Sequence, residues 1–172
     1  MPNHITNKLT VTGPESTGII EACKSEKSEF DFNKILPMPD ELQNTTSPCE
    51  QNDEFIAKYG YDNWYNWSIA NWGTKWNCYD VHADSNFVEF DTAWCTPKPL
   101  FQALSTMYPE ALLTIEYADE DIGYNCGVLT YQNGKLLEYI PKDIGNLDSK
   151  EESVRWAMVV KYGSDEGYED YL

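Results

Sequence analysis

The stretch FVEFDTAWCTPKPLFQALSTMYPEALLTIEY, residues 87–117, decides the fold, because its pattern predicts a strand, a helix and a second strand in immediate succession. Over residues 87–94, large apolar side chains alternate with small or acidic ones, which is the period of a strand with one buried face. Thr96 then provides an N-cap, and apolar residues recur on one helical face until Pro109 ends the helix. The alternation returns over residues 113–117, so a second strand follows the helix directly.

On the N-terminal side, the sequence predicts a strand, a helix and a long insertion. Residues 7–12 alternate apolar and polar side chains, as a half-buried strand does. Residues 14–24 are expected to form a short helix, because a proline suits the first helical position and an apolar stripe follows. Two prolines within residues 30–39 stop any helix and favour an extended path. After a polar loop, apolar residues recur at helical spacing, and Gly73 is expected to end the last helix of the insertion. Residues 76–81 are expected to form another strand.

On the C-terminal side, the sequence predicts a β-hairpin and a final helix. Two strands, residues 128–131 and 136–140, flank an Asn-Gly pair, which is the strongest short-range hairpin signal in a sequence. Residues 149–152 have the Ser-x-x-Glu pattern of a capping box, and a broad apolar face follows before Gly163. The remaining residues, 163–172, are acidic, and we expect this tail to be frayed.

This order of elements predicts an α+β fold of the ferredoxin-like class, a sandwich with a βαββαβ core and an extra β-hairpin. We expect a single domain over residues 1–162. It includes a tryptophan-rich helical insertion at about 30–75 and a C-terminal helix at about 149–162, and the acidic tail over 163–172 follows it. A chain of 172 residues is long enough to bury one substantial core.

Four stretches carry a family resemblance: NKLTVTGP at 7–14, DFNKILPMP at 31–39, Trp67 with NWGTKWN at 71–77, and TAW at 92–94 ahead of Pro97. They resemble the YubB-type ferredoxin-like family of bacterial proteins, which are carried by conjugative plasmids, phages and other mobile elements. The resemblance covers about residues 1–140 and leaves the last helix and the acidic tail outside. It implies the fold and a mobile-element setting, in which anti-defence functions are common, and it supplies no catalytic or binding residues.

The charge balance excludes one large class of functions. The chain has 29 Asp and Glu residues against 12 Lys and Arg residues, which gives a formal net charge of -17 and a pI of about 4.2. Such a charge repels phosphate backbones and anionic lipid surfaces, so we expect neither direct nucleic-acid binding nor membrane association. Because 14% of the residues are aromatic, the chain differs from charged disordered proteins and is expected to fold.

The cysteines and the apolar runs indicate the compartment. The five cysteines are widely spaced and include no Cys-x-x-Cys pair, so neither a disulfide framework nor a thiolate zinc site is indicated. No apolar run approaches the length of a membrane span, and the first residues lack the pattern of a secretory signal. We therefore expect a cytoplasmic protein with reduced thiols.

The sequence shows no recognisable catalytic set. It contains no glycine-rich phosphate loop, nucleophile elbow or His-Glu-x-x-His motif. Cys78 and His82 lie four residues apart on an expected strand, which is too far to chelate one zinc ion without a bend. The acidic turn at 119–121 lacks the glutamate that a calcium loop needs at its twelfth position, where Thr130 stands. We expect a non-catalytic protein without cofactor or metal, and an enzyme of unrecognised type is the alternative.

The acidic residues are the main candidates for a binding site. Their excess is densest after residue 109, where 14 acidic residues accompany 5 basic ones. One interpretation is that this charge only keeps the protein soluble. The other is that carboxylates imitate the phosphates of a nucleic acid and inhibit a basic partner by direct contact. We expect this partner to be a basic host protein such as a defence nuclease, and the residues that contact it to be Asp119, Glu120, Asp121, Asp165, Glu166, Glu169 and Asp170.

The tryptophans and asparagines of the insertion offer an alternative binding site. Aromatic rings combined with amide groups can hold a nucleobase, a sugar or a peptide. The candidate lining of such a pocket is Trp64, Asn71, Trp72 and Trp76. The competing interpretation, which we favour for most of these tryptophans, is that they form the core of the insertion. The sequence does not indicate an oligomeric state.

Overall fold

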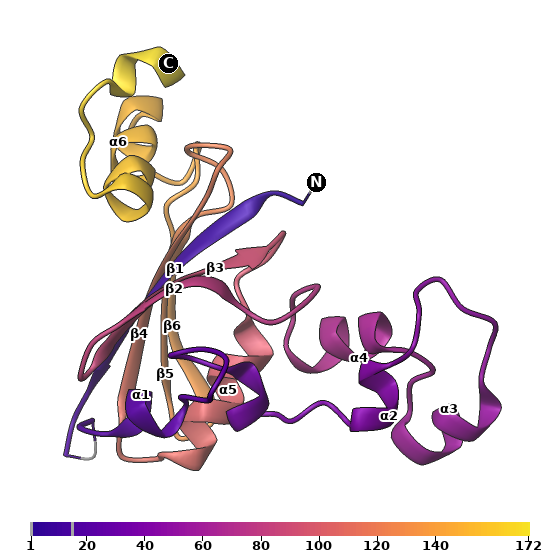
Figure 1. Cartoon of the computed structure of the whole chain (residues 1–172). Helices are drawn as coiled ribbons and strands as arrows, with labels where there is room; N and C mark the ends of the chain where they lie inside the picture. Colours follow the sequence, from indigo (N-terminus) through magenta and orange to yellow (C-terminus); the bar gives the residue numbers. More distant parts are fainter. Residues whose placement is uncertain (1, 15) are drawn as a thin grey trace.

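The computed structural model describes residues 2–14 and 16–172 and is built on one antiparallel sheet of six strands (Figure 1). In chain order the strands are β1 (His4–Thr12), β2 (Tyr79–Ala83), β3 (Phe87–Ala93), β4 (Leu112–Asp119), β5 (Gly127–Gln132) and β6 (Lys135–Pro141). Across the sheet they lie in the order β2-β3-β1-β4-β5-β6. The first four strands, with β1 between β3 and β4, have the ferredoxin-like arrangement. The structure therefore confirms the predicted α+β fold, with β5 and β6 as the added hairpin.

Helices α1 (Ile19–Ala22) and α5 (Lys98–Met107) cover one face of this sheet, where apolar residues of the strands and both helices form one buried cluster. The prediction of a helix over 14–24 was too long. Gly18 lies directly before α1 with a φ of 95°, in the left-handed region, so the regular helix begins only after it. Residue 15, which that prediction included, lies outside the described residues.

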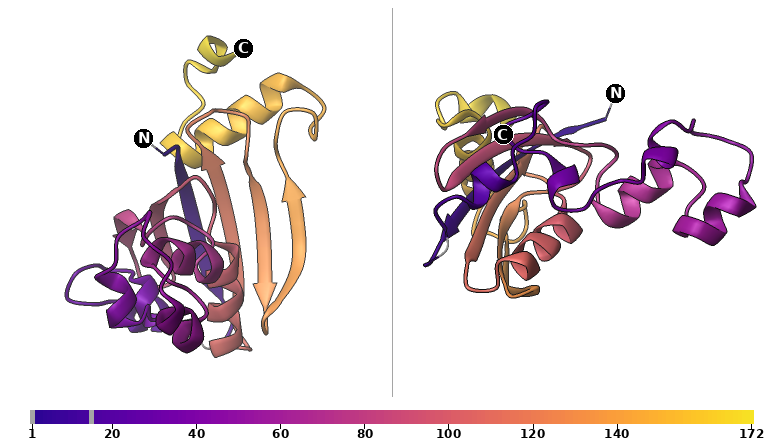
Figure 2. Two further views of the ribbon diagram at one scale, coloured as in Figure 1. Left: turned by 90° about the vertical axis from the view of Figure 1, so that its right-hand side faces the viewer. Right: turned by 60° about the horizontal axis from the view of Figure 1, so that its bottom comes forward.

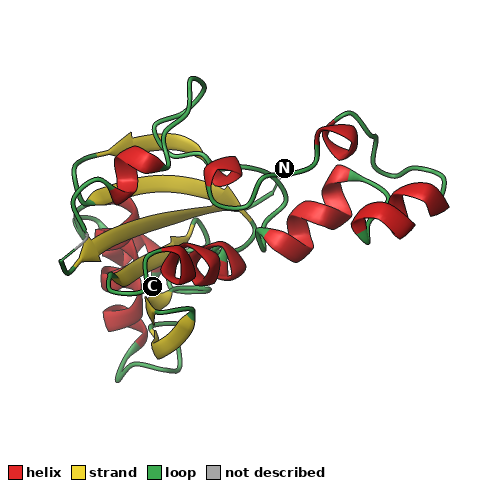
Figure 3. Cartoon of the chain, turned by 90° about the horizontal axis from the view of Figure 1, so that it is seen from below, coloured by secondary structure: helices red, strands yellow, loops and turns green. Residues whose placement is uncertain are grey.

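The insertion between α1 and β2 projects sideways from the sheet (Figures 1 and 3). Trp67 and Trp72 are buried there, and the indole N–H of Trp72 donates to the carbonyl of Leu36 at 2.9 Å. These two tryptophans therefore belong to the core. The elements of the insertion are the 3₁₀ helix η1 (Phe32–Lys34) and the helices α2 (Asp40–Gln43), α3 (Asp53–Tyr59) and α4 (Trp64–Asn71).

The hairpin of β5 and β6 confirms the prediction made from the Asn-Gly pair. Asn133 and Gly134 have φ values of 48° and 71°, and a type I′ turn requires a positive φ at both of its central residues. Strand β6 forms one edge of the sheet and is exposed along most of its length. An irregularity in the β5–β6 register between Thr130 and Tyr131 interrupts this edge, which disfavours pairing with a further strand.

The last helix, α6 (Lys150–Tyr162), crosses the end of the sheet where β4 finishes, on the face opposite α1 and α5 (Figure 2). Ser149 caps it as predicted, because its hydroxyl accepts a hydrogen bond from the backbone N–H of Glu152 at 3.1 Å. Val154 of α6 and Ala118 of β4 belong to a second, smaller buried cluster. Alternation along β4 points Ala118 away from the main core, which leaves this side of the strand for α6.

The C-terminal tail folds back onto α6, so the expectation of a frayed tail was wrong. The tail contains a second 3₁₀ helix, η2 (Tyr168–Tyr171). Arg155 of α6 forms an ion pair with Asp165 at 2.6 Å, and its guanidinium lies 5.0 Å from the ring centroid of Tyr168. These contacts join residues ten or more positions apart, which local sequence patterns do not indicate.

All five cysteines are free thiols in the structure, and Cys23 and Cys126 are buried. None of the helices in the described part of the chain is both long enough and apolar enough to cross a membrane.

Candidate functional site

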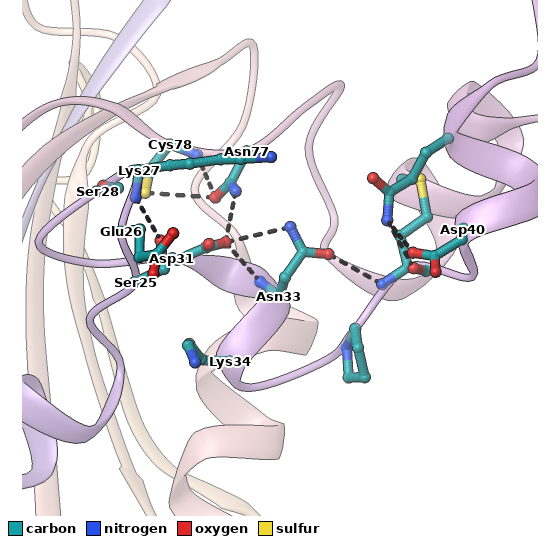
Figure 4. Close-up of a pocket in the computed structure, with 13 residues that line it drawn as sticks. Ser25, Glu26, Lys27, Ser28, Asp31, Asn33, Lys34, Asp40, Asn77 and Cys78 are labelled. Carbon is teal, nitrogen blue, oxygen red and sulfur yellow. Dashed lines mark hydrogen bonds between the residues drawn. The ribbon is translucent and has the colours of Figure 1, made fainter.

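A cavity of about 750 Å³, which we call the loop pocket, lies between the loop that follows α1 and the chain just before β2 (Figure 4). Polar side chains dominate its lining. In the close-up, Asp31, Asn33 and Asn77 point toward one another from two segments that are far apart in the sequence. The pocket therefore brings polar side chains of distant segments together, as a binding or catalytic site does.

Asp31 is the centre of a hydrogen-bond network beside this pocket. One oxygen of its carboxylate accepts from the backbone N–H of Asn33 at 2.9 Å and from the side-chain amides of Asn33 and Asn77 at 3.1 and 2.8 Å. The amide oxygen of Asn77 in turn accepts from the backbone N–H groups of Phe32 and Cys78, at 3.1 and 3.0 Å. These polar groups thus satisfy one another within the protein.

The surroundings of the network shift the pKa values of Asp31 and Cys78. Burial by itself would raise the pKa of Asp31, but the hydrogen bonds from Asn77, Asn33 and Ser25 outweigh it and lower that pKa below its ordinary value. Burial, together with the nearby charge of Asp31, raises the pKa of the Cys78 thiol far above its usual range. A stabilised carboxylate is a weak base and a protonated thiol is a weak nucleophile, so these pKa shifts do not favour catalysis by Asp31 and Cys78.

The stretches that carry the family resemblance meet beside this network. The ring of Phe32 packs edge-on against Trp72, with the ring centroids 5.8 Å apart. The hydroxyl of Thr74 donates to the carbonyl of Ala93, at the end of β3, at 2.7 Å. Because these contacts and the network join the insertion to the sheet, the quoted stretches have a structural role.

The end of the sheet where β2 begins, next to Asn77 and Cys78, brings carboxylates of distant segments together. At this end β1 begins and β4 finishes, and the backbone N–H of Glu120 donates to the carbonyl of His4 at 3.0 Å. Asp91 of β3 accepts a hydrogen bond from the hydroxyl of Thr6 at 2.7 Å. Tyr79 of β2 pairs with Asp91 in the sheet, and Asp80 follows Tyr79 directly in the chain.

The tail adds carboxylates to this end through Tyr162, the last residue of α6. Burial, a hydrogen bond with Tyr171 and the charge of Glu120 raise the pKa of Tyr162. Tyr162 also lines a cavity of about 430 Å³ together with Glu166 and Asp170. We call the set Asp80, Asp91, Glu120, Glu166 and Asp170 the acidic end.

The sequence did not indicate three further residues at the acidic end, His4, Tyr79 and Lys161. Nδ1 of His4 lies 2.6 Å from the hydroxyl of Tyr79, and the ammonium of Lys161 donates to the carbonyl of His4 at 3.1 Å. Burial, followed by the charges of Asp91, Asp80 and Glu120, raises the pKa of Tyr79 to about 12. No motif links these residues, because they come from β1, β2 and α6 and meet only in the folded chain.

Of the seven residues predicted to contact a partner, Asp119 is the one that is buried. It is 5% exposed, and its carboxylate accepts from the side-chain amides of Asn3 and Asn125 at 3.1 and 2.9 Å and from the backbone N–H of Asp121 at 3.0 Å. A buried carboxylate with three donors has a structural role, so its assignment to a partner surface is corrected. Asp165 is held by Arg155, and the exposed members of the set are Glu120, Asp121, Glu166, Glu169 and Asp170.

The four residues of the alternative pocket differ in burial. Trp72 is buried at 3% exposure, whereas Trp76 is 37% exposed. The side-chain amide of Asn71 donates to the carbonyl of Trp67 in its own helix at 2.9 Å, and Trp64 is half-buried at the start of that helix. The assignment of Trp72 to a pocket lining is therefore corrected, because its ring is buried in the core.

Comparison with known proteins gives one match, to a model of the ferredoxin-like domain in Api92-like proteins, over residues 71–160. This range is more than half of the chain and agrees with the topology of the sheet. The chain belongs to this Api92-like family. No curated protein and no solved structure matched it.

The Api92-like domain contains much of the acidic end. The matched range begins at the last residue of α4 and ends within α6, so it includes a helix that we had expected to lie outside the family resemblance. Asp80, Asp91 and Glu120 fall inside the range, and Glu166 and Asp170 lie beyond it. In the loop pocket, Asn77 belongs to the matched domain and its partner Asp31 to the segment before it.

Proposed function

We propose that this chain is a non-catalytic binding protein that contacts a basic protein through its acidic end. The observation that supports this function best is that carboxylates of β2, β3 and the chain after β4 lie at the end of the sheet where β1 begins, with carboxylates of the tail beside the end of α6. Oriented charge of one sign over a limited surface steers and orients an oppositely charged partner.

The pattern of ion pairs also supports this proposal. Among the residues that the structure describes, five carboxylates form ion pairs: Glu21, Glu41, Glu89, Glu151 and Asp165. None of them belongs to the acidic end. The ammonium of Lys161, which lies at this end, is directed to the carbonyl of His4 and the hydroxyl of Thr6. Most of the charge at this end is therefore free to act on a partner.

The partner class that we propose is a basic nucleic-acid-binding protein, such as a host defence nuclease. Such a protein carries lysine and arginine side chains that bind phosphates, and carboxylates at its groove would replace those phosphates. The net charge of -17 suits inhibition by direct contact and disfavours binding to the nucleic acid itself. The family resemblance seen in the sequence adds a mobile-element setting to this proposal.

A defined basic probe tests the proposed surface. The probe is a fluorescent peptide of alternating glycine and arginine, and its binding is followed by anisotropy at low and at moderate salt. The variant Glu120→Gln/Glu166→Gln/Asp170→Asn should bind it about tenfold more weakly, and the effect should shrink as salt rises. Inhibition of purified defence nucleases by the same two proteins then tests the partner class.

The matched control is Glu26→Gln/Glu29→Gln/Glu50→Gln, which removes three exposed carboxylates elsewhere and changes the net charge equally. It should bind within about twofold of the unchanged protein, since its carboxylates lie away from the acidic end. If the affinity of both variants falls by the same factor, the charge acts as a diffuse property of the whole chain, and the proposed surface is refuted.

A second candidate function is binding of a small anionic ligand in the loop pocket. The volume of about 750 Å³ lies in the range of ligand sites, and two lysines of the lining, Lys27 and Lys34, make no ion pair within the described residues. Citrate or a nucleotide at millimolar concentration should raise the melting temperature, and Lys27→Ala/Lys34→Ala should abolish the increase. An unchanged melting temperature with every compound would contradict this candidate.

A further inference from the structure

Two exposed tryptophan rings near the acidic end enclose a lysine. The ammonium of Lys75 lies 4.5 Å from the ring centroid of Trp76 and 4.8 Å from that of Trp94. Both distances are within the range of a cation–π interaction, for which tryptophan is the best aromatic partner. The rings remain 37% and 40% exposed, so they contact solvent as well as the lysine.

Backbone contacts hold Trp94 in an unusual position. Its φ is 68°, in the left-handed region that bulky side chains rarely adopt. Its backbone N–H donates to the carbonyl of Asn3 at 2.9 Å, and its carbonyl accepts from the side-chain amide of Asn125 at 3.4 Å. The exposed ring is thus kept on the surface by the structure around it, an arrangement that is common at binding sites.

The tryptophan pair borders the acidic end. The side-chain nitrogen of Asn125 that contacts the carbonyl of Trp94 also donates to the carboxylate of Asp119, at 2.9 Å. Glu120 and Asp121 follow Asp119 directly and are exposed. Exposed aromatic rings beside carboxylates are the combination that recognises cationic side chains, because the rings supply contact area and the carboxylates supply charge.

We infer that Trp76 and Trp94 form a cation-binding pair for an arginine side chain of the basic partner, and that Lys75 occupies this pair until the arginine replaces it. The inference rests on the proposed function and names the side chain that the surface would recognise. A planar guanidinium stacks on an indole ring better than an ammonium does. Lys75 forms no ion pair among the described residues, so no second contact of that kind opposes its displacement.

The test uses the glycine–arginine peptide and a second peptide in which citrulline replaces arginine. Citrulline has nearly the same shape but no charge. Trp94→Leu and Trp76→Leu should each weaken binding of the arginine peptide by about fivefold, because leucine keeps apolar area and lacks the aromatic quadrupole. Trp94→Phe should bind the arginine peptide more tightly than Trp94→Leu does. Lys75→Ala should strengthen binding by about threefold, because it leaves the pair empty.

Removal of any lysine makes the protein more negative, so Lys75→Ala needs a control of equal charge. Lys135→Ala removes an exposed lysine at the other end of the sheet, and its affinity should change by less than about 1.5-fold. The higher affinity of Lys75→Ala for the arginine peptide should also persist at salt concentrations that suppress diffuse charge effects. Equal gains in the two lysine variants would overturn the displacement of Lys75.

The outcomes separate this inference from the proposed function. If the carboxylate variants weaken binding and both leucine variants bind like the unchanged protein, the cation-binding pair is refuted and the acidic surface stands. If the arginine peptide does not bind the unchanged protein at low salt, the proposed function fails and the inference fails with it. Circular dichroism and urea unfolding of each variant distinguish lost contacts from a misfolded chain.

Discussion

At the loop pocket, the carboxylate of Asp31 accepts hydrogen bonds from Asn33 and Asn77, and the side-chain oxygens of these two asparagines accept from backbone N–H groups. At the acidic end, Glu120, Glu166 and Asp170 are exposed and form no ion pair within the described residues. Both regions assemble polar side chains from distant segments. They differ in whether the polar atoms have partners inside the chain.

This difference indicates which region is structural and which is free to bind. A polar group satisfied within the fold stabilises it, and its loss leaves buried partners without hydrogen bonds. An exposed carboxylate without a partner adds little to stability and exerts its field on the surroundings. The two regions should therefore respond in opposite ways to mutation, with loss of stability at the loop pocket and loss of binding at the acidic end.

The largest effect is expected for Asn77→Ala. This change removes the acceptor of two backbone N–H groups and one donor to Asp31. It should lower the free energy of unfolding by about 2–3 kcal/mol, as measured by urea denaturation, because several buried polar groups lose their partners. The matched control Asn66→Ala removes an exposed asparagine of α4 and should cost less than about 0.5 kcal/mol. Equal losses would mean that the network adds nothing beyond a typical surface contact.

The fold was predictable from the sequence because its signals are local. The Asn-Gly pair marked the hairpin, Ser149 marked the start of α6, and the order of strands and helices gave the ferredoxin-like class. Local signals failed where long-range contacts decide the outcome. The tail is one example, since it is ordered by the pairing of Arg155 with Asp165.

The candidate site was only partly predictable, because residue type does not reveal burial. Trp72 and Trp76 are four residues apart, yet the first lies in the core and the second on the surface. Asp119 and Glu120 are neighbours, and the first is buried because Asn3, 116 residues away, donates to it. The acidic character of the C-terminal part could be read from composition, whereas its convergence with β2 and β3 depends on the sheet order.

The ionised carboxylate of Asp31, at the loop pocket, should make the stability of the protein depend on pH. The pKa of Asp31 is lowered in the folded protein, so the ionised carboxylate stabilises the fold at pH values above its unfolded pKa of about 3.9. This contribution is lost as the pH falls through the lower folded pKa. Urea denaturation should therefore show Asp31→Asn less stable than the unchanged protein at pH 6, with the difference shrinking as the pH falls below about 4.

Glu26→Gln, at the rim of the same pocket, is the control for this pH dependence. Glu26 is exposed, so its substitution should leave the acid-induced loss of stability as large as in the unchanged protein. A constant difference between Asp31→Asn and the unchanged protein from pH 6 to pH 2.5 would show that the charge of Asp31 does not contribute to the network.

The smallest effect on stability is expected at the acidic end itself. Glu120→Gln/Glu166→Gln/Asp170→Asn should change the free energy of unfolding by no more than about 0.5 kcal/mol, and toward higher stability, because it relieves repulsion among like charges. Urea denaturation at low salt should show this gain, and at high salt it should vanish. The same variant is the one expected to lose affinity for the arginine peptide. If this variant is slightly more stable and binds more weakly, these carboxylates serve contact with a partner. A large loss of stability would instead show that they stabilise the fold, as Asp31 does.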